Sequence, residues 1–288
     1  PDNPQRFAAL SNMAARLAVD GVGNWRPDVV HGHDWQAGLT PLYLRDAPNR
    51  PGTLLTIHNV AFHGLAPASA MASLGLDRAD FTSDGFEFWN QISALKAGVV
   101  YSDKINTVSA TYAHELLTPE FGMGMDGVLK TRAHDLSGIL NGIDTQVWNP
   151  ATDPAIATYT TPRGKAKAKA ALRAEFALAE ADGPLTVVVS RLSEQKGLDA
   201  LLAALPALID HGGQLALLGT GHKALESAWR AAASHPNVSV HIGYDEARSH
   251  RMIAGADAIL VPSRFEPCGL TQLYGLRYGT LPGVARTG

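Results

Sequence analysis

The chain of 288 residues lacks several features that mark whole classes of proteins. It has one cysteine, Cys268, which excludes an internal disulfide and a cysteine-rich zinc site. No apolar run reaches the roughly 18 residues expected of a membrane-spanning helix. The first twenty residues also lack the basic-then-apolar order of a signal peptide. We therefore expect a cytoplasmic protein that does not interact with membranes.

An excess of charge of one sign is also missing. Lysine and arginine total 24 against 27 aspartates and glutamates, so the formal net charge is −3, and no long basic run occurs. Because nucleic-acid binding depends on clustered positive charge, no nucleic-acid partner is expected. What the chain does have is 45% hydrophobic residues, enough to bury a large core, and a length that favours two domains.

Short β-branched runs alternate with longer amphipathic runs, a pattern typical of parallel sheets covered by helices. In the first half it predicts strands at residues 27–33, 53–59, 104–109 and 137–143, and helices at 35–44, 89–101 and 110–117. In the second half it predicts strands at residues 185–192, 214–221, 238–243, 258–263 and 281–286, and helices at 197–209, 223–234, 245–256 and 270–279. The fold class is therefore α/β, with two doubly wound, Rossmann-like units.

The predicted domains are residues 1–140 and 141–288, with a linker at about 148–183. The first part of this linker is rich in proline and threonine, which favours an irregular crossing segment. The second part, KAKAKAALRAEFAL, contains good helix formers and predicts a helix whose lysines form a solvated face.

In open α/β sheets, ligands bind beyond the carboxyl ends of the strands. Polar residues gather at these positions in both halves. In the first half they are His31, His33, Asp34, His58, Asn59, Asn141 and Asp144. In the second half they are Arg191, Lys196, Gly219, Tyr244 and Glu266. The sequence therefore predicts two rows of polar groups that face each other across a cleft.

The first row has simpler interpretations. A single polar residue after a strand is usually part of a turn or cap, and this remains open for His31. His33, His58 and Asp34 form a possible transition-metal cluster, because imidazole and carboxylate groups suit several such metals. Their spacing does not decide the matter. A row of phosphate-binding cations opposite these residues disfavours the interpretation as a hydrolytic metal site.

Arg191 and Lys196 are the more informative pair. Two cations beside a strand end, followed by Gly197 and a helix, make a positive site near free amide groups, which suits a diphosphate. An ion pair with Glu194 or another nearby acid is an equally good interpretation. Gly219 stands at a strand-to-helix turn where a ligand can approach the backbone, although the full glycine pattern of a dinucleotide fold is missing.

The stretch ILVPSRFEPCGLTQLYG, residues 259–275, places an acid just before a helix. The free amides of Gly269, Leu270 and Thr271 at the start of that helix can hold an anion. A phosphate would repel Glu266, so we interpret its carboxylate as an acceptor for sugar hydroxyls or as support for positive charge developing at a sugar carbon. Cys268 is interpreted as a small buried thiol in a packed turn.

These residues lie in strings that resemble bacterial glycogen synthases and the related plant starch synthases. The strings are HGHDWQAGL, TIHNVAFHG, KINTVSATYAHELLTPEFGMGMDGVL, GILNGIDTQVWNPATD, SRLSEQKGLD and GYDEARSHRMIAGADAILVPSRFEPCGLTQLYGLRYGTLP. The resemblance runs nearly end to end. It implies a two-domain GT-B glycosyltransferase that moves glucose from ADP-glucose to the nonreducing end of an α-1,4-glucan, with retention and without a metal or cofactor.

The resemblance also implies a role for each matching residue. Arg191 and Lys196 match the basic pair that holds the diphosphate and stabilises the departing ADP. Glu266 matches the acid that contacts the donor glucose, His58 the histidine near the transferred sugar, and Asp34 the acid of the HDW motif at the cleft.

Further matches concern substrate binding. Tyr244 matches the aromatic residue that stacks on adenine, and Asn141 the cleft asparagine at the start of the second domain. Gly269, Leu270 and Thr271 match the amide-rich turn at the phosphates. Stacking on Tyr244 suits any flat base, so the preference for ADP-glucose over UDP-glucose rests on the resemblance alone.

The chain departs from the family pattern in three places. A KTGGL loop near the amino terminus is absent, the segment that follows VARTG in the family is absent, and Tyr274 stands where many GT-B enzymes have a second glutamate. We therefore expect a chain truncated at both ends, which folds less well and is inactive by itself. Two alternatives stay open, namely a GT-B enzyme with another donor and an inactive glucan-binding protein.

Overall fold

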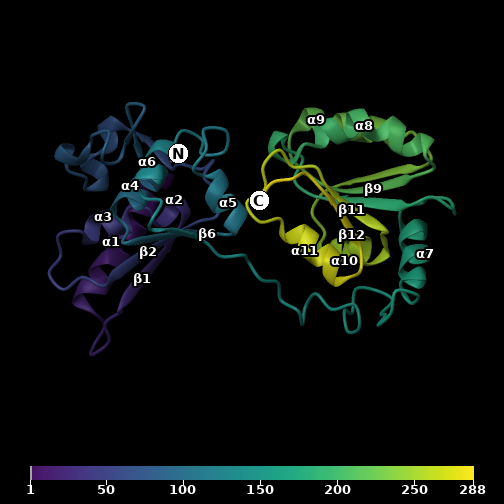
Figure 1. The fold of residues 1–288 in the computed structure, drawn as a ribbon, viewed down its shortest axis with the longest axis horizontal. Coiled ribbons are helices and arrows are strands. Elements are labelled where there is room, and N and C mark those ends of the chain that lie inside the picture. Colours follow the sequence, from purple (N-terminus) through teal and green to yellow (C-terminus); the bar gives the residue numbers. More distant parts are fainter. Residues whose placement is uncertain (1) are drawn as a thin grey trace. The chain divides into compact units, whose positions relative to one another are not determined.

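The computed structural model describes residues 2–288 and divides into two compact units (Figure 1). The first unit runs to Leu140, and the second comprises Asn141–Thr287. Each unit has its own parallel sheet and its own hydrophobic cores.

The first unit contains a parallel sheet in the order β1-β2-β6-β7. Its strands are β1 (Val29–His33), β2 (Gly52–Ile57), β6 (Lys104–Thr107) and β7 (Leu136–Gly138). The four predicted strands are therefore confirmed, but β7 ends earlier than predicted. The chain leaves the sheet after Gly138, whose Cα packs so closely on the backbone that an added Cβ would lie 2.2 Å from the carbonyl oxygen of Ser109.

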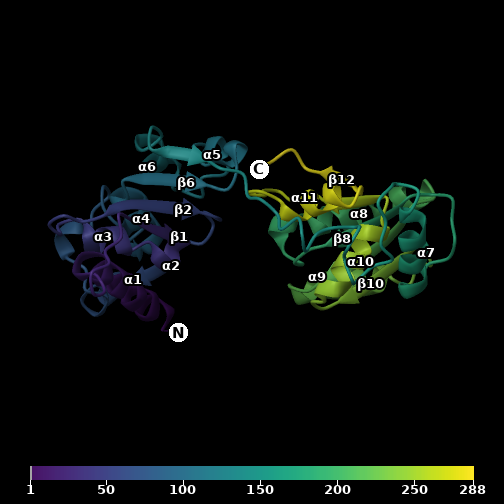
Figure 2. The same ribbon diagram turned by 90° about the horizontal axis from the view of Figure 1, so that it is seen from below.

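Helices of the first unit pack on one another beside the sheet (Figure 2). They are α1 (Asn3–Asp20), α2 (Asp34–Ala37), α3 (Thr40–Leu44), α4 (Ala94–Tyr101), α5 (Ala110–Glu115) and α6 (Asp126–Thr131). The prediction of one continuous helix at residues 35–44 is wrong, because this segment forms two short helices. It breaks into α2 and α3 at Gly38, where an added Cβ would lie 2.1 Å from the carbonyl oxygen of Ala94.

The predicted helix at 89–101 is wrong in its first part. Residues before Ala94 belong to a small antiparallel sheet in the order β3-β5-β4. Its strands are β3 (Leu65–Pro67), β4 (Glu87–Phe88) and β5 (Gln91–Ser93). Trp89 and Asn90 turn the chain with φ angles of 49° and 61°, and the Ser93 hydroxyl then caps α4 by accepting from the N–H of Lys96. Between β3 and β4 lie the short 3₁₀ helices η1 (Ala68–Ala70), η2 (Ala72–Leu74) and η3 (Arg78–Asp80).

The second unit confirms all the strands predicted for it. Its parallel sheet has the order β10-β9-β8-β11-β12. The strands are β8 (Leu185–Val189), β9 (Gln214–Gly219), β10 (Val238–Ile242), β11 (Ala258–Val261) and β12 (Leu281–Val284). Strand β9 is buried along its whole length, as expected for a central strand with helices on both faces.

Helices cover both faces of this sheet (Figure 1). On one face, α8 (Leu198–Asp210) and α9 (Lys223–Ala232) share a core with Val188 and Leu217. On the other face, α7 (Lys165–Glu175) and α10 (Glu246–Gly255) share a core with Val187 and Leu218. Adjacent strand residues thus face opposite layers, which is a doubly wound arrangement. Within residues 2–288, no helix is long and apolar enough to cross a membrane.

The segment that begins at Trp148 is built into the second unit. The Trp148 ring stacks between those of His250 and Tyr274, with centroids 3.8 Å and 3.7 Å away. Asp153 is buried and accepts hydrogen bonds from His250 Nδ1 at 2.7 Å and from the Tyr278 hydroxyl at 2.5 Å. These contacts attach the irregular segment to α10 and to the chain after α11 (Leu270–Arg277).

The lysines of α7 do not form one solvated face, so that expectation was wrong. Lys165 donates to the carbonyl oxygen of Tyr278 at 3.2 Å and to the Thr280 hydroxyl, and burial lowers the pKa of its amine to about 8. Lys169 forms an ion pair of 2.7 Å with Asp257, whereas Lys167 is exposed. Tertiary packing of α7 on α10 therefore draws two of the three lysines inward.

Replacing Asp153 with alanine should destabilise the chain by about 2–4 kcal/mol, because two buried groups, on His250 and Tyr278, would lose their acceptor. Burial alone would raise the pKa of Asp153, but hydrogen bonds from Tyr278, the Ala155 N–H and His250 together lower it. Urea unfolding monitored by circular dichroism measures the loss. Asp182→Ala, which removes an exposed carboxylate, is the matched control. Equal stability of the two variants would contradict this role.

Candidate active site

Two loops of the second unit are tied together at the carboxyl edge of its sheet. One follows β8 and the other follows β11, and these strands are parallel neighbours. The backbone N–H of Arg264 donates to the carbonyl oxygen of Gln195 at 2.9 Å, and its guanidinium donates to that of Glu194 at 2.6 Å. The same guanidinium binds both carboxylate oxygens of Asp199, at 2.8 Å and 2.6 Å. Arg264 thereby fixes the two loops relative to each other.

At the centre of these loops, Lys196 and Glu266 form an ion pair. Lys196 Nζ lies 2.5 Å from Glu266 Oε2, and the hydroxyl of Ser263 donates to the same oxygen at 2.8 Å. Only 16% and 13% of the two side chains are exposed. Of the two interpretations left open for Lys196, the ion pair is therefore present, but its partner is Glu266 rather than Glu194.

A small cavity of about 40 Å³ lies beside this pair, lined by Lys196, Glu266 and the start of α11. Helix α11 begins at Leu270, as predicted, and its N-cap Gly269 has a φ of 74°, which favours glycine. The N–H groups of Leu270 and Thr271 belong to the first turn and have no acceptors within the helix. A lysine, a carboxylate and a helix N-terminus thus border one cavity, which suits an anion joined to a hydroxyl-rich group.

A second, larger cavity of about 210 Å³ adjoins the first and shares Val189 and Ser190 with it. It is lined by Arg191, Gly219 and Tyr244. The Tyr244 side chain is 86% exposed, so its ring is free to stack on a flat group. At Gly219, an added Cβ would lie 1.9 Å from the carbonyl oxygen of Ser190, so this position accepts glycine alone. Arg191 is exposed and makes no ion pair with any residue from 2 to 288.

The glycine turn after β9 depends on Glu226, which the sequence did not single out. Its carboxylate accepts from the N–H of Gly221 at 2.9 Å and from the hydroxyl of Thr220 at 2.7 Å. These bonds, with that of Gly221 the largest contribution, hold the pKa of Glu226 below its usual range. The one available signal was an acid in the first turn of α9, which is common in helices and therefore not specific.

Asn141 and Cys268 meet beside the turn that carries Glu266. Cys268 is 5% exposed, as predicted for a buried thiol. Burial raises the pKa of this thiol, and hydrogen bonds with Asn141 partly offset the rise. Cys268 is two positions after Glu266 in the sequence. Its contact with Asn141 therefore brings Asn141 to the turn that carries Glu266, although the two residues are far apart in the sequence.

In the first unit, Asp34 and His58 meet at the carboxyl edge of the sheet. Asp34 has a φ of 54°, and its Oδ1 accepts from the N–H groups of His58 at 2.7 Å and Asn59 at 3.3 Å. His33 Nδ1 and His58 Nε2 are 2.9 Å apart. His31 lies inside β1 and is bonded to the hydroxyl of Thr56 on β2, at 2.6 Å, so it is not the turn or cap residue that was left open.

The arrangement of His33, His58 and Asp34 is not that of a metal centre. Among the residues that the structure describes, no three side chains of the ligating types are placed to hold an ion. The Asp34 carboxylate is turned to the backbone instead. Burial, followed by the neighbouring His31 and His58, lowers the pKa of His33, while Asp34 opposes the change. His33 is therefore neutral at pH 7.

Comparison with known proteins agrees with the strings noted in the sequence. A starch synthase catalytic domain model matches residues 1–131, and a group 1 glycosyl transferase model matches residues 183–285. A glycogen synthase of Paracoccus denitrificans is 64% identical over 290 residues, and one of Jannaschia sp. is 62% identical over 289 residues. Over its full length, this chain is similar to glycogen and starch synthases.

Both bacterial relatives match 100% of this chain, which spans about 61% of their length. The catalytic domain of starch synthase IV from Arabidopsis thaliana, in a structure bound to ADP and acarbose, is 34% identical and has a TM-score of 0.89. That alignment covers 100% of this chain and 62% of the plant chain. The expected GT-B fold with parallel, Rossmann-like sheets is confirmed, and the second unit has the strand order of a doubly wound sheet.

The His33 ring should titrate below the ordinary histidine pKa of 6.5. His58→Ala should raise the pKa of His33, because it removes a neighbour that becomes positively charged on protonation. An NMR titration of the histidine ring protons measures both values. His134→Ala is the control, because the His134 side chain is 75% exposed and lies elsewhere. An unchanged His33 pKa in His58→Ala would contradict the coupling.

Proposed function

We propose that this chain carries the reaction centre of a retaining glycosyltransferase, which moves glucose from ADP-glucose to the nonreducing end of an α-1,4-glucan. The observation that carries the proposal is the Lys196–Glu266 pair beside the start of α11, in a chain 64% identical to a glycogen synthase. The ADP and acarbose bound by the plant starch synthase are a nucleotide and a sugar analogue of the same classes.

Departure of ADP is the step that the second unit assists most directly. Breaking the bond between the sugar carbon and the phosphate oxygen places negative charge on the diphosphate. Lys196, Arg191 and the free N–H groups of Leu270 and Thr271 stabilise that charge, and a preorganised site of this kind lowers the barrier. Gly269 keeps the start of α11 in the conformation that presents those N–H groups.

Glu266 acts on the sugar side of the same bond. Its Oε2 is held by Lys196 and Ser263, while no described residue donates to Oε1. Oε1 accepts a hydroxyl of the donor glucose and stabilises positive charge that develops at the reacting carbon. The Lys196 ammonium offsets the negative charge of Glu266 and so reduces its repulsion of the diphosphate.

The larger cavity of the second unit accommodates the nucleoside in this proposal. Tyr244 stacks on the adenine, and Gly219 lets the backbone at Ser190 pack closely against the end of β9, beside this cavity. Asn141, held against Cys268, supports the turn that carries Glu266. The first unit serves the acceptor, with Asp34 fixing the His58 backbone so that His58 steadies the transferred sugar.

Retention of configuration follows from a reaction on one face of the sugar. The acceptor hydroxyl forms its bond to the anomeric carbon on the side from which ADP leaves, and its proton passes to the departing phosphate oxygen. No enzyme nucleophile, metal or cofactor takes part in this scheme. The proposal places the reaction in the cytoplasm. A chain with a single cysteine forms no internal disulfide and so does not require an oxidising compartment to fold.

Transfer should fall at least about 100-fold in kcat in both Glu266→Gln and Lys196→Met, because each removes charge stabilisation at the reacting bond. The assay measures glucose transfer from ADP-glucose to glycogen. It uses an extended chain, in which the matching end segments of the Paracoccus denitrificans relative are added to this sequence. Glu194→Gln, which neutralises an exposed acid of the same loop, is the control and should keep its rate.

The donor and the reaction are tested in the same assay with UDP-glucose. Transfer from UDP-glucose alone would replace ADP-glucose as the donor and favour another GT-B activity. No transfer from either donor, with glycogen binding retained, would favour a glucan-binding protein without activity. Full activity in Glu266→Gln would contradict the role of the ion pair.

A further inference from the structure

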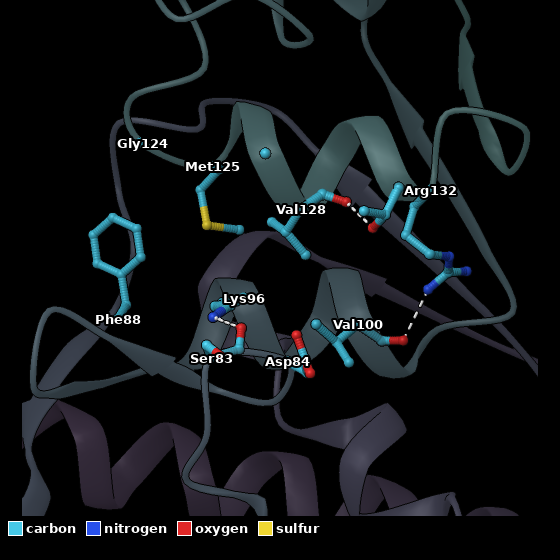
Figure 3. A pocket seen from close by; sticks show the side chains of 11 residues that line it. Ser83, Asp84, Phe88, Lys96, Val100, Gly124, Met125, Val128 and Arg132 are labelled. Carbon is cyan, nitrogen blue, oxygen red and sulfur yellow. Dashed lines mark hydrogen bonds between the residues drawn. The ribbon is translucent and has the colours of Figure 1, made fainter.

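A cavity of about 500 Å³ lies in the first unit and is lined by α4, by α6 and by the chain around β4 (Figure 3). The apolar part of its lining consists of Phe88, Val100, Met125 and Val128. None of these residues has a role in the proposed reaction. Cavities of this size are typical of small-molecule sites, which combine apolar walls with a few polar groups that fix the ligand.

The first polar group at this cavity is the ammonium of Lys96. The residue is 7% exposed, and its Nζ donates to the carbonyl oxygens of Ser83 and Glu87, both at 2.6 Å. An ammonium has three N–H groups, so one N–H is left without an acceptor in the described part of the chain. Burial lowers the pKa of Lys96, whereas the carboxylates of Glu87 and Asp84 raise it and favour the charged form.

The second polar group is the carboxylate of Asp84. This residue is exposed and lines the cavity, and its carboxylate receives no hydrogen bond from any residue between 2 and 288. It lies close enough to Lys96 to influence the pKa of the ammonium, but the two form no direct ion pair. A positive and a negative group thus border one cavity, and each can still bind a ligand.

Arg132 also lines the cavity, but its guanidinium is already paired (Figure 3). It donates to the carbonyl oxygens of Val99, at 2.7 Å, and Val100, at 2.8 Å, near the end of α4. It also forms an ion pair of 3.0 Å with Asp135. Arg132 therefore caps a helix C-terminus, where a cation is favourable, and the ammonium and the carboxylate described above remain the available charged groups.

We propose that this cavity binds a small zwitterion, namely an α-amino acid with an apolar side chain. The carboxylate of the ligand accepts from Lys96, its ammonium donates to Asp84, and its side chain packs on the apolar lining. A simple anion would be repelled by Asp84 and a simple cation by Lys96. A zwitterion instead gives both groups a charge-assisted hydrogen bond. Binding of this ligand does not depend on the proposed transfer of glucose.

Equilibrium dialysis with radiolabelled L-leucine tests the site, on the 288-residue chain and on the extended chain. Asp84→Asn should weaken binding at least about tenfold, because it removes the charge that pairs with the ammonium of the ligand. Asp20→Asn is the matched control, because it neutralises an exposed carboxylate of the same unit outside the cavity, and it should bind like the parent.

A second variant fills the cavity instead of changing its charge. Gly127 lines the cavity in the first turn of α6, and a Cβ added there has no atom within 4 Å. Gly127→Leu should therefore weaken L-leucine binding by occupying part of the space. Because leucine is a better helix former than glycine, urea unfolding should show that this variant is at least as stable as the parent.

Two analogues test whether both charges of the ligand are needed. Leucinamide lacks the carboxylate and 4-methylpentanoate lacks the ammonium, so neither should displace L-leucine as well as unlabelled L-leucine does. Equal displacement by either analogue overturns the site, as does equal binding by Asp84→Asn and Asp20→Asn. Absence of L-leucine binding by the parent, or its loss in the extended chain, also overturns it. Dialysis contains no sugar donor or glycogen, so a failure of glucose transfer leaves these outcomes unchanged.

Discussion

The ion pair between Lys196 and Glu266 is the interaction on which the second unit's edge depends. Removing one partner would leave the other charge largely buried and unpaired, at a cost of about 3–5 kcal/mol. Each residue therefore requires the other, and the loops after β8 and β11 must remain together. Arg264 supports the same arrangement by joining the two loops through Gln195 and Asp199. The position of the α11 N-terminus beside the pair follows from these contacts.

Both units place their polar groups by the same geometric rule. Parallel strands deliver their carboxyl ends to one edge, so groups distant in sequence become neighbours, as Asp34 and His58 do in the first unit. Neighbouring backbone occupies the space that a side chain would need at some positions, most clearly at Gly219 and Gly38. Lys96 similarly fixes the loop before β5, because its ammonium donates to the carbonyl oxygens of Ser83 and Glu87. Binding groups are thus set by the fold rather than by flexible surface chains.

The sequence predicted the parallel strands and most of the proposed site, because β-branched periodicity and the strand-end rule are local signals. It failed where long-range packing decides. The close approach of Gly38 to the backbone of Ala94 joins residues far apart in the sequence, and the antiparallel turn at Trp89 has a backbone conformation that propensity does not reveal. Helix α1 was missed because its buried side consists largely of alanines, which give little amphipathic contrast. The partner of Lys196 was beyond reach because it lies 70 residues away.

A double-mutant cycle tests the central claim most directly, by comparing kcat for glucose transfer in Lys196→Met, Glu266→Gln and the variant that carries both changes. If the two residues act as one unit, the double variant should be about as slow as the slower single variant, because the second change removes an interaction already lost. If the two losses multiply instead, Lys196 and Glu266 act independently, and the account of the site as a coupled charged pair is contradicted.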